Sequence, residues 1–323
     1  MDISCAFASS PDTPDHIALA EQLGYRRAWC YDSPALYPDV WMTLALAAQR
    51  TRRIELGPGV LVPNLRHVMT NAAAIATLEN LAPGRVVVAI GAGFTGRVAL
   101  GQRSLPWTRV RAYIEALRAL LRGEDVMWDG AVIKMLHPAG FAPPRPIAVP
   151  ILVGADGPKG AAVAQDLGDG IFGRARAPGI TWYAQLHFGT VLDPSEDPGS
   201  ERVLAAAGHA AAVGFHGRYE RGGVEALPGG REWLQQIEAL PASTRHLAVH
   251  EEHLVSVNAI DRPFITPELL LRLGLAGSVE AQRERLTQLA QQGVTEVAYQ
   301  PAGPDIPREL TAFARMAGLQ TNR

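Results

Sequence analysis

The sequence is short of lysine, of cysteine, of long apolar runs and of net charge. Lys134 and Lys159 are its only lysines, so arginine supplies the remaining positive charge. The formal net charge of −2 gives no bulk electrostatic reason to bind nucleic acid or an anionic membrane. No run of about 18 apolar residues occurs, so no segment is predicted to span a bilayer. The start, MDISCAFASSPD, has no basic flank, so we expect no signal peptide there.

Cysteine is present only as Cys5 and Cys30, which are too few for a disulfide framework. Both lie in apolar runs, and this predicts buried thiols in a cytoplasmic protein. With 323 residues, of which 47% are hydrophobic and 19% charged, the chain can bury a large core. That length fits one large α/β barrel or two modest domains.

Apolar runs and helical periodicity alternate along most of the chain. We predict strands at residues 3–8, 26–31, 54–62, 86–90, 151–153, 170–172, 182–192 and 295–299. We predict helices at residues 14–24, 40–49, 67–81, 108–121, 158–167, 201–215, 231–240, 266–273, 278–292 and 306–317. Residues 123–150 are rich in proline and have no periodicity, so they are predicted to be a long loop or excursion.

About eight strands with helices between them predict an α/β fold of the (β/α)8 TIM-barrel type with insertions. No change in composition marks a linker, and no short repeat occurs. We therefore expect a single domain of residues 1–323, with a divergent insertion region at about residues 175–275. A doubly wound sheet with a cap domain is the structural alternative.

The stretch from Arg53 to Gly93 carries the clearest functional signal. Two apolar runs, each ending in glycines, flank an alanine-rich helix, so both glycine tips lie at the same end of a parallel sheet. Loops at the carboxyl ends of parallel strands are where such folds hold cofactors. We expect the functional site at that end.

The glycine motif GAGFTG, residues 91–96, matches the G-x-G-x-x-G pattern of dinucleotide-binding folds. That reading requires a helix that begins inside the motif and faces the pyrophosphate. Gly101 and Pro106 argue against such a helix before Thr108. We therefore favour glycines that form a tight turn or that let the backbone approach a flat ligand.

Several segments together resemble the bacterial luciferase-like superfamily, and within it the coenzyme F420-dependent methylenetetrahydromethanopterin reductases. They are LGPGVLVPNLRH, GRVVVAIGAG, ILVGADGPKG followed by DLGDGIFG, and GVTEVAYQPAGPD. The resemblance covers Ile3 to Gly173 and Gly277 to the end. It implies a luciferase-like TIM barrel that holds F420 or FMN at the carboxyl ends of its strands, usually as a homodimer or higher homo-oligomer.

The third strand of relatives ends in a bulge with a non-proline cis peptide behind the cofactor ring. The resemblance places this bond at Gly59-Val60, where an ordinary turn is the alternative. It also implies that Asp32, at the end of the second strand, meets the ring, although an Asx turn before Pro34 fits as well. Asn64 and Arg66 would reach the ring edge or the cofactor tail, or would be solvated loop residues.

A helix start at GADGPK, residues 154–159, offers free backbone N–H groups to an anion. F420 has a phospholactyl-oligoglutamate tail, and Lys159, Arg174 and Arg176 would supply positive charge to it. The alternative is a plain helix start with an exposed lysine. The predicted cofactor-binding residues are Ser9, Asp32, Gly59, Val60, Asn64, Arg66, Gly91, Ala92, Gly93, Gly154, Ala155, Asp156, Gly157, Lys159, Gly173, Arg174 and Gln300.

Three departures from the family pattern narrow the expected activity. Several deazaflavin relatives have an acid after strand one, where this chain has Ser9 and Ser10. The sugar-phosphate dehydrogenases have a glutamate in place of Phe94 and a histidine in place of Gln300. A glucose-6-phosphate dehydrogenase is therefore not expected, and proton delivery in a methylenetetrahydromethanopterin reductase would need another group.

The insertion contains HLAVHEEHLV, with His246, His250 and His253. The spacing is not the H-E-x-x-H of zinc helices, so no metal site is predicted. The cluster is either structural or solvated, or it contributes a pocket acid or base from His250 or His253, since histidine titrates in the useful range. The predicted catalytic residues are Asp32, His250 and His253.

The expected function is that of an F420-dependent oxidoreductase, which transfers a hydride between deazaflavin C5 and a small organic substrate. The alternative is an FMN-dependent luciferase-like monooxygenase, in which reduced flavin reacts with oxygen. A third reading is a cofactor-binding or partner subunit without turnover. No nucleic-acid or membrane partner is expected.

Overall fold

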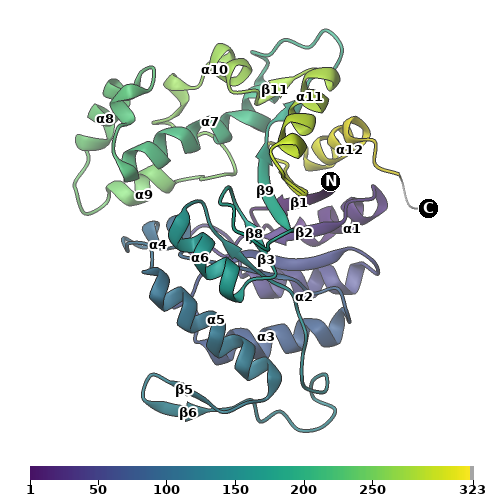
Figure 1. The fold of residues 1–323 in the computed structure, drawn as a ribbon. Coiled ribbons are helices and arrows are strands. Elements are labelled where there is room, and N and C mark those ends of the chain that lie inside the picture. Colours follow the sequence, from purple (N-terminus) through teal and green to yellow (C-terminus); the bar gives the residue numbers. More distant parts are fainter. Residues whose placement is uncertain (321–323) are drawn as a thin grey trace.

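The computed structural model describes residues 1–320 and contains a closed barrel of eight parallel strands (Figure 1). In order around the barrel these are β1 (Asp2–Phe7), β12 (Glu296–Gln300), β9 (Tyr183–Phe188), β8 (Gly170–Phe172), β7 (Ile151–Gly154), β4 (Val88–Gly91), β3 (Glu55–Leu61) and β2 (Arg27–Cys30). The predicted (β/α)8 barrel is confirmed, and the doubly wound alternative is wrong. Within the described residues, no helix has the length and hydropathy needed to cross a membrane.

Helices cover the outside of the barrel, and the main hydrophobic core lies between them and the strands. They are α1 (Thr13–Gln22), α2 (Val40–Arg50), α3 (Val68–Leu81), α5 (Trp107–Arg122), α6 (Pro158–Leu167), α11 (Val279–Gln291) and α12 (Ile306–Ala317). Helix α2 begins at Val40 as predicted, because the side chain of Asp39 accepts hydrogen bonds from the backbone N–H groups of Trp41 and Met42. Ser278 caps α11 in the same way, through the N–H of Ala281.

The interior of the barrel is filled by a second hydrophobic cluster. Trp29 is its largest side chain and meets Phe172 edge to face, with ring centroids 5.1 Å apart. Small residues surround the indole, and a Cβ added at Gly59 would lie 3.0 Å from it. The barrel interior is therefore a packed core.

Glu296 is fully buried at the start of β12 and organises the amino end of the barrel interior. Its carboxylate accepts hydrogen bonds from the indole N–H groups of Trp29, at 2.9 Å, and Trp182, at 2.6 Å. The Arg27 guanidinium lies 2.8 Å from the same carboxylate and 4.4 Å from the Trp182 ring centroid. A buried carboxylate is tolerated where hydrogen-bond donors and an opposite charge contact both of its oxygens, as they do here.

The predicted insertion forms a group of helices beside the barrel, at the upper left of Figure 1. It consists of β10 (Thr190–Val191), α7 (Glu201–Arg221), η1 (Val224–Ala226), α8 (Gly230–Glu238), α9 (Arg245–His250), η2 (Arg262–Phe264), α10 (Pro267–Arg272) and β11 (Ala276–Gly277). These elements share a hydrophobic cluster of their own around Phe215, Trp233 and Leu270. Strands β10 and β11 pair in parallel and link the insertion's two ends.

Several short elements differ from the sequence prediction. The segment expected to be irregular contains the hairpin β5 (Val126–Trp128) and β6 (Ala131–Ile133), which turns at Asp129-Gly130 with φ of 48° and 84°. An Asp-Gly pair is a strong hairpin signal, but strands of three residues are too short to show a period. The glycine motif also runs into a helix, α4 (Phe94–Val98), which the sequence analysis did not expect.

Two predicted elements differ from the observed ones by several residues at one end. The expected strand at 182–192 is interrupted at Gly189, whose φ is 124°. A Cβ there would lie 2.5 Å from the Leu275 carbonyl oxygen, and after it the chain leaves the barrel to form β10. The helix expected at 201–215 continues through Gly217 to Arg221 and ends at Gly222 and Gly223, whose φ values are 87° and 92°.

Removing the charge of Glu296 should destabilise the fold. Glu296→Gln removes a negative charge that compensates the buried Arg27 guanidinium, and one buried donor loses its acceptor. We therefore expect the free energy of unfolding to fall by about 2–4 kcal/mol. Urea unfolding measures this loss. Glu124→Gln, which removes an exposed partner of Arg122, is the control and should not move the midpoint. Equal midpoints for the two variants would contradict the role of Glu296.

Buried neutral histidines should make the fold sensitive to acid. Burial lowers the pKa of His187 to about 3 and the pKa values of His209 and His250 to about 4. Below about pH 6.5, the pKa of a histidine in the unfolded chain, the unfolded state binds more protons than the folded state. Each buried histidine therefore lowers the free energy of unfolding by about 1.4 kcal/mol for each pH unit. Stability measured by urea unfolding should fall steeply between about pH 6.5 and pH 5. His209→Leu should reduce the slope, and a flat profile would refute the assignment.

Candidate functional site

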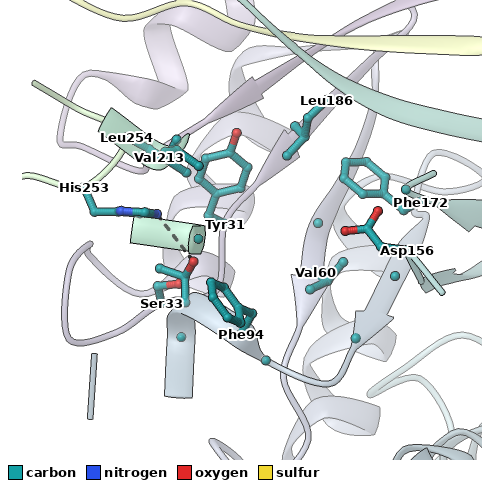
Figure 2. A pocket seen from close by; sticks show the side chains of 18 of the residues that line it. Tyr31, Ser33, Val60, Phe94, Asp156, Phe172, Leu186, Val213, His253 and Leu254 are labelled. Atoms are coloured by element: carbon teal, nitrogen blue, oxygen red, sulfur yellow. Dashed lines mark hydrogen bonds between the residues drawn. The ribbon is translucent and has the colours of Figure 1, made fainter. Parts of the chain in front are cut away.

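A cavity of about 790 Å³ opens at the carboxyl ends of the barrel strands. Its wall comes from the ends of β2, β3, β4, β7, β8 and β9, and from α7 and the loop after α9. Figure 2 shows Val60, Asp156 and Phe172 on one side, with Tyr31, His253 and Leu254 on the other. This volume is typical of cofactor and small-molecule sites.

The floor of the cavity is formed by the end of β3. The Gly59-Val60 peptide is cis, as predicted, and the pairing of β3 with β4 shifts register between Gly59 and Leu61. The Val60 side chain lies between Gly91 and Gly154, where an added Cβ would come within 2.9 and 2.8 Å of its methyl groups. Only glycine at these two positions leaves room for Val60, so the floor is apolar and closely packed.

A helix, α4, begins inside the glycine motif, so the sequence argument that no helix would start there was wrong, but the glycines of the motif pack closely against neighbouring loops. Gly93 has a φ of 78°, and a Cβ there would lie 2.2 Å from the Val62 side chain. At Gly96 a Cβ would lie 3.0 Å from the Asp32 carbonyl oxygen. The motif therefore allows close packing of neighbouring loops at the cavity, in agreement with the sequence interpretation.

Asp32 lies in the cavity wall, but its carboxylate is directed toward Arg66, 2.5 Å away. The same guanidinium lies 2.6 Å from Asp39, and the Val62 N–H donates to Asp32 at 3.4 Å. Burial raises the pKa of Asp32, an effect that the Arg66 ion pair opposes, and the pair raises the pKa of Arg66. These contacts fix the loop that follows β3. A catalytic role for Asp32 stays a prediction.

The structure brings most of the predicted cofactor-binding residues together. Those in the wall are Asp32, Gly59, Val60, Gly91, Ala92, Gly93, Gly154, Ala155, Asp156, Gly173 and Arg174. Those that do not line the wall are Ser9, Asn64, Arg66, Gly157, Lys159 and Gln300. Of the predicted catalytic residues, Asp32 and His253 line the cavity and His250 does not.

Gln300 supports the wall from behind. Its amide donates to the Leu254 carbonyl at 2.5 Å, and its oxygen accepts from the Tyr31 hydroxyl at 2.8 Å. Both hydrogen-bonding ends are therefore used within the protein. Ser9 is also buried, and its hydroxyl makes no hydrogen bond to the described residues. Neither side chain is directed to the cavity as the sequence analysis expected.

Of the three positively charged side chains predicted to bind a cofactor tail, one lines the cavity and two do not. Arg174 lies in the wall and pairs with Asp156 at 3.3 Å, and Lys159 is exposed in the first turn of α6. Arg176 instead lies over the Tyr183 ring and donates to the Gln292 carbonyl, so the structure does not bring it to the cavity. Arg221, which the sequence analysis missed, lines the wall near Phe94.

The insertion brings a line of hydrogen-bonding groups to the cavity. His253 Nε2 lies 3.4 Å from the Thr95 hydroxyl, and its Nδ1 lies 3.0 Å from Nδ1 of His216. His216 Nε2 lies 2.8 Å from a carboxylate oxygen of Asp261. The other oxygen of Asp261 accepts from the Trp233 indole at 2.7 Å. The exposed fractions of His253, His216 and Asp261 are only 5%, 2% and 2%.

His250 lies beside this line but does not belong to it. Its ring centroid is 5.2 Å from that of His253, its Nδ1 donates to the His246 carbonyl, and its Nε2 is buried without a partner. Burial lowers the pKa of His253 well below its ordinary value, and the neighbouring His216 adds to this shift. Among the described residues, no cluster of three potential metal ligands occurs.

Sequence reasoning found His253 but missed Thr95, His216 and Asp261. These residues come from α4, from the middle of α7 and from the loop before η2, and no spacing connects them. Their contacts depend on how the insertion packs against the barrel. Only the position of Thr95, directly after the glycines of β4, was a signal that it would lie at the cavity.

Comparison with known proteins is consistent with this geometry. A family model described as "Luciferase-like monooxygenase" matches residues 8–181. The chain is 29% identical to a 5,10-methylenetetrahydromethanopterin reductase of Archaeoglobus fulgidus, over 93% of this chain and 92% of the relative. It is 36% identical to an F420-dependent glucose-6-phosphate dehydrogenase of Beutenbergia cavernae, over 48% and 50% of the two chains.

The fold has a close match among solved structures. A coenzyme F420-dependent tetrahydromethanopterin reductase from Methanopyrus kandleri superposes with a TM-score of 0.66 at 18% identity, covering 99% of this chain and 100% of the other. That likeness concerns the fold. The family model covers more than half of the chain and includes the β3 bulge and the glycine tips that form the cavity floor. The chain belongs to the luciferase-like monooxygenase family.

Proposed function

We propose that the protein is an oxidoreductase that uses coenzyme F420 to transfer a hydride to or from a small organic molecule. The observation that carries the proposal is the floor of the cavity, where Val60 follows a cis peptide and lies between Gly91 and Gly154. A flat apolar floor at the carboxyl end of a barrel suits a planar tricyclic ring. Curated relatives named for reduction and for F420 dependence support the choice of cofactor.

The fit of such a ring follows from the space that the glycines leave. Side chains at positions 91 and 154 would clash with Val60 and push it into the cavity. Glycine at both positions therefore leaves the space above Val60 free for a ring. When bound, the deazaflavin supplies the hydride chemistry at C5. The protein's part is to position the ring on Val60, to hold the β3 loop through Asp32 and Arg66, and to exclude water with apolar side chains such as Phe172 and Leu186.

FMN is the alternative cofactor, because the same floor accepts either ring and the family name is that of monooxygenases. Positive charge at the rim favours F420, since its oligoglutamate tail is more anionic than one phosphate. Arg174 in the wall, Lys159 at the start of α6 and the free N–H groups of that helix all lie near Asp156. Binding of either cofactor without turnover would instead indicate a binding subunit.

We also propose that the protein works as a homo-oligomer. Helix α2 exposes Met42 and Leu46, and the neighbouring α3 exposes Leu81. Exposed apolar side chains on adjacent helices suit contact with a second copy. The molar mass in solution, compared with 34.6 kDa for one chain, tests this proposal. A single-chain mass at micromolar concentration would refute it.

Charge at the rim should distinguish the two cofactors. In Lys159→Ala/Arg174→Ala, we expect about tenfold weaker binding of F420, with a smaller change for a deazaflavin that lacks the phospholactyl tail. Fluorescence titration under anaerobic conditions measures both affinities and that of FMN. Lys134→Ala is the matched control, because this lysine pairs with Asp125 beside the β5–β6 hairpin. Tighter binding of FMN than of F420 by the unaltered protein would contradict the proposal.

The position of Val60 between Gly91 and Gly154 should be essential for cofactor binding. In Gly154→Ala the new methyl group would lie 2.8 Å from a Val60 methyl, so Val60 must move into the space for the ring. We expect at least about tenfold weaker F420 binding with little change in Tm. The double variant Gly154→Ala/Val60→Ala removes the clash and should recover most of the affinity. Unchanged affinity in the single variant would show that the ring does not lie on this floor.

A further inference from the structure

The hydrogen bonds that end at His253 determine which ring nitrogens carry protons. An ionised carboxylate only accepts, so His216 must carry a proton on Nε2, which faces Asp261. A neutral His216 then presents a lone pair at Nδ1, and His253 must donate to it from its own Nδ1. The Nε2 of His253 is consequently unprotonated where it meets the Thr95 hydroxyl at the cavity.

The two imidazoles are arranged for proton transfer between them. Their Nδ1 atoms lie 3.0 Å apart, the ring planes differ by 28° and the centroids are 5.2 Å apart. When His253 gains a proton at Nε2, it can pass its Nδ1 proton to His216. The positive charge then lies beside Asp261, the one carboxylate paired with His216 among residues 1–320.

The two imidazoles differ in the groups that surround them. Burial, together with His216, His250 and His209, disfavours protonated His253, and its backbone carbonyl accepts from the Tyr37 hydroxyl. Only His216 touches a carboxylate. The titratable groups that face the two rings are Tyr37, His209, Glu220, His246, His250 and Asp261.

We propose that His253 exchanges the proton that accompanies hydride transfer, that His216 and Asp261 position it and store the charge, and that the substrate is a carbonyl compound or its alcohol. The inference rests on the proposed function. Apolar Phe94, Val213 and Leu254 belong to the same wall as His253, so the expected substrate is an alcohol or ketone on an apolar skeleton (Figure 2).

The step balances in both directions. In oxidation, the alcohol carbon loses its hydrogen with both electrons to the oxidised deazaflavin, and the O–H bond gives its proton to His253 Nε2. The Nδ1 proton of His253 then moves to His216, and a carbonyl group remains on the substrate. In reduction, the hydride comes from the reduced deazaflavin and the same protons move back to the new alkoxide oxygen.

Asp261→Asn tests the proton arrangement without any cofactor. The Asn oxygen can still accept from Trp233, which leaves its NH2 group to donate to His216 Nε2. This reverses both tautomers and leaves a proton on His253 Nε2. Nitrogen-15 NMR of histidine-labelled protein should show His253 protonated at Nδ1 in the wild type and at Nε2 in the variant. The same His253 tautomer in both proteins would overturn the relay.

Turnover tests the catalytic part. With F420 and a panel of apolar secondary alcohols, we expect His253→Gln to lose about 10²–10⁴-fold in kcat, and Asp261→Asn to lose oxidation activity, while F420 affinity stays within about twofold. His67→Asn is the control and should retain activity, because His67 is an exposed residue outside the cavity wall and Asn can also cap α3.

The outcomes separate the two proposals. Failure of the wild-type protein to bind F420 overturns the proposed function. Normal F420 binding with undiminished turnover in His253→Gln overturns only the relay. Normal F420 binding with turnover on no alcohol or ketone overturns the substrate class.

Discussion

The contact of Val60 with Gly91 and Gly154 is the constraint on which the site depends. Three neighbouring strands meet there: β3 ends in the bulge that presents Val60, and β4 and β7 each end in a glycine without which Val60 would not fit. Side chains of the barrel core, such as Trp29 and Phe172, fill the barrel interior. Val60 therefore cannot move down into the barrel. The space next to Val60 that can hold a planar ligand is therefore the cavity at the carboxyl end.

The barrel and the insertion contribute different parts of the site. The barrel supplies the floor, the Asp32–Arg66 pair that fixes the β3 loop, and the rim charge at Arg174. The insertion supplies most of the opposite wall and, through His216, His253 and Asp261, its titratable groups. This division places the cavity floor in the part of the chain that the family model matches, residues 8–181, and His216, His253 and Asp261 in the part outside it.

Much of the barrel could be predicted from the sequence because apolar runs and caps carry that information locally. The ends of α6, β8 and α12 were predicted to the residue, and the cis bond at Gly59-Val60 was predicted from the family resemblance. The relay could not be predicted in full, because His216 and His253 are 37 residues apart and meet only through the packing of the insertion. Gln300 and Arg66 were assigned to the cavity, but neither lines it. Gln300 is hydrogen-bonded to Tyr31 and Leu254, and Arg66 is paired with Asp32 and Asp39.

A crystal structure of the protein with F420 tests the central claim most directly. We expect electron density for the deazaflavin ring lying flat on Val60, with the Val60 side chain between Gly91 and Gly154 and His253 Nε2 facing the substrate space beside the ring. A ring bound elsewhere, or a Val60 side chain turned away from Gly91 and Gly154, would contradict this claim.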